Sequence, residues 1–93
     1  MDISDEELSR EVIIVNELGL HARSAGKIAK LAQNTQSTIW LIKGNEKVDA
    51  SSIIDILTLA CAKGSKIMLT VDSKPDIHIL NEITALVERG FEE

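Results

Sequence analysis

The chain has 93 residues, of which 44% are hydrophobic and 27% charged, and its formal net charge is −5. This length and composition fit one globular domain rather than a disordered chain. No apolar run reaches the roughly 20 residues that a transmembrane helix needs. An acidic chain with one tryptophan and one phenylalanine is also a poor candidate for nucleic-acid binding. The single cysteine, Cys61, cannot form an internal disulfide, so we expect a soluble cytoplasmic protein.

The acidic residues are concentrated at the two ends of the chain. Residues 1–10 carry four acids and one base, residues 88–93 carry three acids and one base, and the span between them is neutral. We therefore expect an acidic N-terminal tail over 1–10, a single domain over 11–90 and a short C-terminal tail over 91–93.

The first two predicted elements are a strand and an amphipathic helix. A β-branched run, Val12-Ile13-Ile14-Val15, predicts a strand over residues 11–16, and Gly19 ends it. Apolar residues, most of them small, then recur at helical spacing over residues 22–33: Ala22, Ala25, Ile28, Ala29 and Ala32. A stripe of such small residues would let this helix approach a sheet closely.

The middle of the chain predicts a hairpin and a short helix. Residues 38–42 and 46–49 are typical of two strands, joined by a turn at Gly44. Ser51 or Ser52 can cap the start of a helix over residues 53–59, and an acid follows Ser52 at the spacing of a capping box.

A fourth strand and a third helix complete the chain. Alternating and β-branched residues predict a strand over 66–71, and Ser73 and Pro75 mark the start of a helix that runs to about Arg89. The resulting order is β-α-β-β-α-β-α. It predicts a two-layer α+β sandwich, with antiparallel pairing at least in the hairpin.

His21 is the residue best placed to carry chemistry. It stands immediately before the helix over 22–33, where backbone N–H groups lack intrahelical partners and the helix dipole favours an anion. The same field disfavours a charged imidazole and leaves a ring nitrogen free for nucleophilic attack. Arg23 could neutralise phosphoryl oxygens. Because such a histidine is often only a polar cap, both interpretations stay open on these residues alone.

The other candidate residues do not predict a second chemistry. His78 is interpreted as an exposed polar residue of the last helix, and Cys61 as a small buried hydrophobe. No histidines and cysteines have the spacing of metal ligands, so we expect no metal and no cofactor. A hydrolase that uses Ser24 and His21 would lack both an orienting acid and a Gly-x-Ser-x-Gly turn.

Three separated segments of the chain carry sequence motifs that are best interpreted as one set. They are GLHARSA at residues 19–25, VDASSII at 48–54 and AKGSKI at 62–67. In this register they resemble the HPr family, the histidine-containing phosphocarriers of the bacterial phosphoenolpyruvate-dependent sugar phosphotransferase system, over about residues 11–90. The resemblance implies an open-faced β-sandwich, in which three helices cover one face of a four-stranded antiparallel sheet.

The resemblance also implies roles for the residues at matching positions. His21 is similar to the histidine that carries the phosphoryl group on its δ1 nitrogen, and Arg23 to the arginine that steadies this group. Ser52 matches the serine phosphorylated by HPr kinase/phosphorylase in lineages that possess this enzyme. The surface offered to enzyme I and to the IIA proteins matches Ala22, Gly26, Lys27, Lys30, Ile53, Ile54 and Leu57.

The resemblance implies a phosphocarrier rather than an enzyme, which accepts phosphoryl from enzyme I and passes it to IIA-type proteins. The alternative is an HPr-like regulatory binding module, nitrogen-type or kinase-linked, that signals metabolic state through its phosphorylation. Two residues depart from the family pattern: Ser24 stands where proline is usual, and Asp55 where a small residue is common. Both are expected to affect partner choice and transfer rate more than the chemistry.

Overall fold

Strands and helices follow one another in the predicted order in the computed structural model, which describes residues 7–93. The strands are β1 (Ser9–Ile13), β2 (Ile39–Lys43), β3 (Glu46–Asp49) and β4 (Lys66–Val71). The α-helices are α1 (Ala22–Ala32), α2 (Ile53–Thr58) and α3 (Ile77–Glu88). Two single turns of 3₁₀ helix, Lys74–Asp76 and Gly90–Glu92, precede and follow α3.

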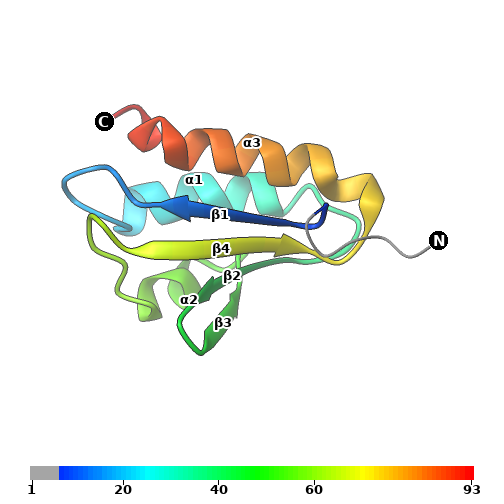
Figure 1. The fold of residues 1–93 in the computed structure, drawn as a ribbon, viewed down its shortest axis with the longest axis horizontal. Coiled ribbons are helices and arrows are strands. Elements are labelled where there is room, and N and C mark those ends of the chain that lie inside the picture. Colours follow the sequence, from blue (N-terminus) through cyan, green and yellow to red (C-terminus); the bar gives the residue numbers. More distant parts are fainter. Residues whose placement is uncertain (1–6) are drawn as a thin grey trace.

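The four strands form one antiparallel sheet in the order β1-β4-β2-β3. Because side chains alternate between the faces of a strand, Val12, Leu41 and Leu69 all point to the buried face. Helix α3 contacts β1 and β4, α1 packs beside α3, and the buried side chains of both helices share one core with those of the sheet; Figure 1 shows α3 running alongside β1. This arrangement confirms the predicted α+β open-faced sandwich with a four-stranded antiparallel sheet.

The small-residue stripe of α1 is confirmed over most of its length. Ala25, Ile28, Ala29 and Ala32 are buried, whereas Ala22 is exposed and the fully buried residue of the first turn is Ser24. The predicted face is therefore wrong at its first position, because the first turn of α1 presents its third residue inward. The polar side chain of Ser24 can be buried there because its hydroxyl has hydrogen-bond partners in the loop before the helix.

Both predicted tails differ from the structure. Strand β1 begins at Ser9, which pairs with Thr70 of β4, so the sheet takes in residues predicted to belong to the tail over 1–10. Residues 1–6 of that tail lie outside the described residues. At the other end Phe91 is fully buried in the core, so residues 91–93 are not a tail. The free energy gained by burying a large aromatic side chain exceeds the cost of drawing the adjoining acids toward the core.

Two smaller predictions concern Cys61 and membrane insertion. Cys61 is 3% exposed and packs in the core, as predicted, and its burial raises the pKa of the thiol. Across residues 7–93, no helix has the length and apolar character required to span a bilayer.

The buried carboxylate of Asp76 ties the segment after α1 to the start of α3. Although only 2% exposed, it accepts hydrogen bonds from the backbone N–H groups of Gln36 and Ser37 at 2.9 and 2.8 Å. The Ser37 hydroxyl donates a further bond of 2.5 Å. These bonds, that of the Ser37 hydroxyl above all, hold the pKa of Asp76 below its usual value.

We expect Asp76→Asn to lower the free energy of unfolding by about 2 kcal/mol at pH 7, because its amide NH₂ would face backbone donors. Since folding lowers this pKa, the stabilisation by the carboxylate is present above about pH 4 and is lost as the pH falls through the folded value. The difference between the two proteins should therefore shrink in acid. Urea unfolding at pH 7 and pH 3 measures it, with the exposed Asp72→Asn as control. Equal stability at pH 7 would contradict the assigned role.

Candidate functional site

His21 lies where the loop after β1 meets the last residues of the chain. Figure 1 shows that loop, in blue, at the same end of the molecule as the C-terminus, in red. The loop is held against residues 61–64: Leu20 N donates to Cys61 O at 2.8 Å, and Gly64 N donates to Ile14 O at 2.7 Å. These backbone bonds fix the point at which α1 begins.

Gly19 makes the close approach of this loop possible. Its φ of +65° lies in the left-handed region, and a Cβ at this position would lie 2.4 Å from the carbonyl oxygen of Cys61. A residue with a side chain would be strained and would also collide with backbone. Gly19 therefore determines where His21, two residues later, is placed.

His21 is the N-cap of α1, as predicted. Its backbone is extended, its Nδ1 accepts from the N–H of Arg23 at 3.2 Å, and its own N–H donates to Ser24 Oγ at 3.0 Å. Ser24 Oγ donates in turn to Gly19 O at 3.3 Å. A ring nitrogen that accepts a hydrogen bond carries a lone pair, so in the neutral ring the proton is on Nε2.

The second ring nitrogen of His21 faces a carboxylate. Nε2 lies 2.5 Å from Oε2 of Glu93, and the two side chains are 26% and 15% exposed. The other oxygen of this carboxylate, Oε1, accepts a hydrogen bond from Asn16 Nδ2 at 2.9 Å. The guanidinium of Arg23 lies 4.0 Å from Oε2. The Asn16 amide, with a smaller effect from His21, holds the pKa of Glu93 below its usual value, so the group is ionised at neutral pH.

The sequence does not reveal Glu93 and Asn16 as site residues. They lie 72 and 5 positions from His21 and belong to no local motif with it. The sequence predicts a last helix that runs to about Arg89 and assigns residues 91–93 to a tail, whereas the chain turns at Gly90, whose φ is +67°. No pattern in the sequence shows that burial of Phe91 turns the next residues toward α1.

The predicted partner surface is formed by the exposed sides of α1 and α2. Ile53, Ile54 and Leu57 are 41%, 74% and 38% exposed, which is high for large apolar side chains. A Cβ on Gly26 would lie 3.7 Å from the Ile53 side chain, so the two helices adjoin there. Asp55 is exposed among these apolar residues.

Two lysines of α1 lie differently from one another. Lys30 is exposed, as expected of a partner-binding residue. Lys27 is half-buried, and its ammonium donates to the carbonyl oxygen of Phe91 at 2.8 Å. The contact of Lys27 with the end of the chain is not evident in the sequence.

The remaining predicted residues all lie at or near the start of a helix. Ser52 caps α2, because its hydroxyl accepts from Asp55 N at 3.2 Å. His78 is exposed on α3, with Nδ1 3.0 Å from Pro75 O. Arg23, whose side chain is 67% exposed, projects beside His21.

The surroundings of the site show no metal centre. Over residues 7–93, no three His, Cys, Asp or Glu side chains are grouped so that they could hold an ion.

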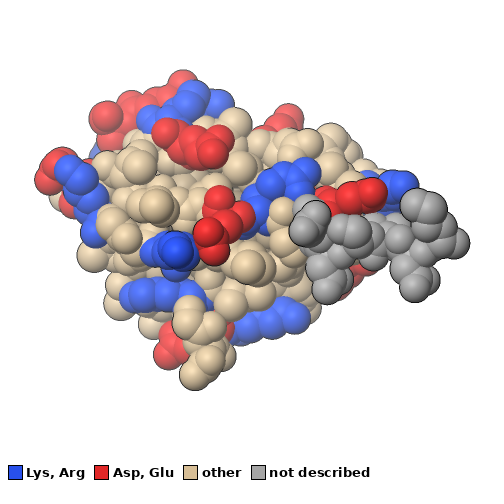
Figure 2. Space-filling view, in the orientation of Figure 1, with Lys and Arg blue, Asp and Glu red and all other residues tan. Residues whose placement is uncertain are grey.

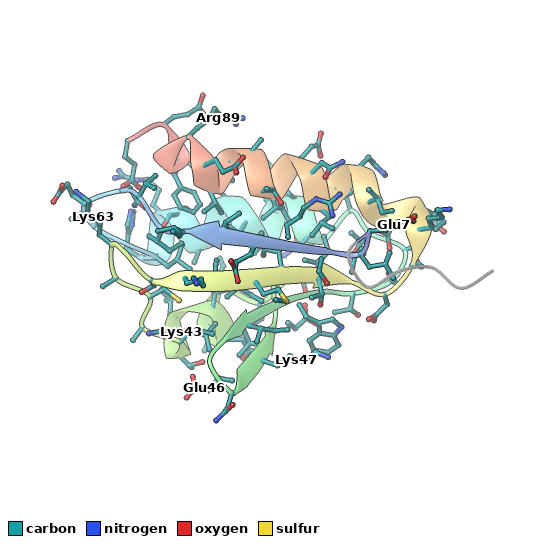
Figure 3. All side chains as sticks on the ribbon, in the orientation of Figure 1. Glu7, Lys43, Glu46, Lys47, Lys63 and Arg89 are labelled. Carbon is teal, nitrogen blue, oxygen red and sulfur yellow. The ribbon has the colours of Figure 1, made fainter. Side chains whose placement is uncertain are left out.

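Lys63, labelled at the loop end in Figure 3, pairs with Glu17 of the loop before His21. Charges of both signs are interspersed on the face shown in Figure 2, which has no continuous basic surface.

Comparisons with known proteins identify relatives of this chain. The family model described as "PTS HPr component phosphorylation site" matches residues 8–89. Phosphocarrier protein HPr of Neisseria meningitidis serogroup A is 34% identical over 86 residues, which cover 92% of this chain and 97% of that protein. Phosphocarrier protein NPr of Shewanella violacea is 38% identical over 87 residues, 94% of this chain and 96% of that protein.

A solved structure shows the same fold. The crystal structure of HPr from Thermoanaerobacter tengcongensis superposes with a TM-score of 0.85 at 32% identity, covering 91% of this chain and 96% of that one. The family match spans nearly all of the described residues and includes the segment that holds His21. The chain therefore belongs to the HPr family of phosphocarriers of the phosphotransferase system, the family that its three motifs resemble.

Proposed function

We propose that this protein accepts a phosphoryl group from enzyme I on Nδ1 of His21 and passes it to IIA-type proteins for sugar uptake in the cytoplasm. The observation that carries this proposal is that Nδ1 accepts a hydrogen bond from the N–H of Arg23 at the start of α1, on a ring that is 26% exposed. Such a nitrogen can reach a partner's phosphoryl group without opening the fold.

The geometry supports direct attack by Nδ1 on phosphorus. The incoming group would replace the 3.2 Å bond from the N–H of Arg23, which then becomes available to a phosphoryl oxygen. The other N–H groups of the first turn face the same point, and the helix dipole favours the negative charge. The exposed guanidinium of Arg23 can turn onto the remaining oxygens.

An intact-mass measurement tests this proposal. The protein is incubated with phosphoenolpyruvate and enzyme I, and its mass is compared before and after exposure to acid. We expect the addition of one phosphoryl group that acid removes, because a phosphorus–nitrogen bond to imidazole is acid-labile. An unchanged mass, or an acid-stable product, would contradict it.

The second candidate is an HPr-like regulatory binding module, nitrogen-type or kinase-linked. The identities of 38% to the NPr of Shewanella violacea and 34% to the HPr of Neisseria meningitidis, both phosphocarriers by name, do not separate the two functions. A transfer assay separates the two functions. A sugar carrier passes its phosphoryl group to a sugar-specific IIA protein, whereas a regulatory module becomes phosphorylated on His21 and does not support that second transfer.

We also propose that Ser52 is a regulatory site for HPr kinase/phosphorylase. A phosphate on its hydroxyl would place about −1.5 to −2 charges next to Ile53 and Ile54, which a partner must desolvate. It would not need to break α2, because negative charge is favourable at the start of a helix.

We expect Ser52→Asp to slow phosphorylation of His21 by enzyme I about fivefold, the rate equivalent of about 1 kcal/mol of unfavourable charge. The control is Ser52→Ala, which loses the cap and about 1 kcal/mol of stability but adds no charge. Transfer at the parent rate in Ser52→Asp, with unchanged helix content, would leave this serine a capping residue only.

A further inference from the structure

Glu93 is held in place as firmly as the histidine that it contacts. Its Oε1 accepts from Asn16 Nδ2 at 2.9 Å and its Oε2 lies 2.5 Å from His21 Nε2, so both oxygens are engaged. The side chain is only 15% exposed. A surface carboxylate that met the ring by chance would not also have the second bond, from Asn16.

Asn16 acts as the anchor for this carboxylate. The residue is 7% exposed, and its amide nitrogen donates both to Glu93 and to Gly19 O, at 2.9 Å in each case. Both partners are acceptors, so the orientation of the amide is settled. Its Oδ1 is buried without a hydrogen-bond partner among the described residues, an unfavourable arrangement that calls for an explanation.

The backbone before Glu93 is bent to bring it to the ring. Phe91 and Glu92 have φ values of +59° and +62°, which are unusual for residues with a side chain. The fully buried Phe91 ring and the bond from Lys27 to Phe91 O hold this turn. Backbone strain that the surroundings maintain points to a function for the residue it positions.

We infer that Glu93, oriented by Asn16, is a positioning residue for phosphoryl transfer by His21. Its carboxylate holds the ring proton on Nε2, so that the lone pair of Nδ1 faces the start of α1. It then stabilises the positive charge that the ring acquires in the reaction. This inference rests on the proposed function.

The transfer step assigns a place to each electron pair and to the proton. The lone pair of Nδ1 forms a bond to phosphorus while the bond from phosphorus to the donor breaks, and the donor keeps that electron pair. The proton stays on Nε2, hydrogen-bonded to the Glu93 carboxylate. The ring becomes an imidazolium until a base removes this proton, and an ionised partner 2.5 Å away favours that form.

The test compares Glu93→Ala with Glu92→Ala, which removes an exposed acid one residue earlier and changes the net charge equally. NMR of unphosphorylated protein labelled with ¹⁵N histidine follows the Nε2–H proton. We expect a downfield resonance that exchanges slowly with water in the parent and in Glu92→Ala, and its loss in Glu93→Ala. This signal does not depend on phosphorylation.

Rates of phosphorylation by enzyme I complete the test. We expect Glu93→Ala to be about tenfold slower than the parent, the effect of one charged hydrogen bond. Glu93→Gln, which keeps the size and removes the charge, should also be slower, and Glu92→Ala should match the parent. An unchanged Nε2–H signal, or an unchanged or faster rate in Glu93→Ala, would overturn the inference. If even the parent accepts no phosphoryl group, the proposed function fails, and the positioning role in transfer fails with it.

Discussion

Replacing His21 with alanine will abolish phosphorylation by enzyme I and leave the fold intact. The imidazole supplies the nucleophilic nitrogen, and alanine supplies none. The main-chain groups of residue 21 keep their bonds, since its N–H donates to Ser24 Oγ and its carbonyl accepts from Ala25 N at 2.8 Å. The side chain loses its cap, at a cost of about 1 kcal/mol, and its contact with Glu93 at the surface.

Intact mass after incubation with phosphoenolpyruvate and enzyme I measures this effect, and thermal unfolding verifies the fold. The control is His78→Ala, which removes an exposed imidazole elsewhere, on α3. That variant should gain one phosphoryl group like the parent. A His21→Ala protein that still accepts the group would show that another residue is the acceptor.

Gly19→Ala is expected to have the second largest effect. Alanine at a φ of +65° is strained, and its Cβ would lie 2.4 Å from Cys61 O, so backbone must move. Together these effects should lower the free energy of unfolding by about 4 kcal/mol. The backbone movement at residue 19 would also displace His21, two residues later. Phosphorylation should therefore become slower under conditions in which the variant is folded.

Gly44→Ala is a matched control for this prediction. Its φ of +59° is similar, but nothing lies within 4 Å of the added Cβ, so it carries the backbone strain without the collision. We expect it to lose about 1 kcal/mol and to be phosphorylated normally. Urea unfolding and single-turnover rates measure both variants, and equal losses in the two would show that the close approach to Cys61 is unimportant.

The sequence predicts the elements of this fold well because their patterns are local. The stripe of α1 depends on residues three and four positions apart, and β4 on strict alternation. The first strand is displaced, since it is predicted over 11–16 and observed at Ser9–Ile13. Ile14 is fully buried and extends the apolar run, yet its N–H bonds to Ser65 O outside the regular ladder, which no local pattern can show.

In the same way, some residues of the site can be predicted from a local motif, and others depend on contacts between distant parts of the chain. His21 and Arg23 can be found from the sequence because they stand in one motif at a helix start. The carboxylate of Glu93 cannot, because its position depends on how Phe91 enters the core 70 residues later. The acidic composition of residues 88–93 suggests a solubilising tail, but the burial of Phe91 makes this segment part of the packed domain.

The most direct test of the central proposal is to identify the phosphorylated atom. Protein labelled with ¹⁵N histidine is phosphorylated by phosphoenolpyruvate and enzyme I, and coupling between ³¹P and ¹⁵N is recorded by NMR at alkaline pH, where the bond to nitrogen survives. The geometry predicts coupling to Nδ1 of His21, whose lone pair faces the start of α1. Coupling to Nε2, or phosphorus attached to any other residue, would contradict it.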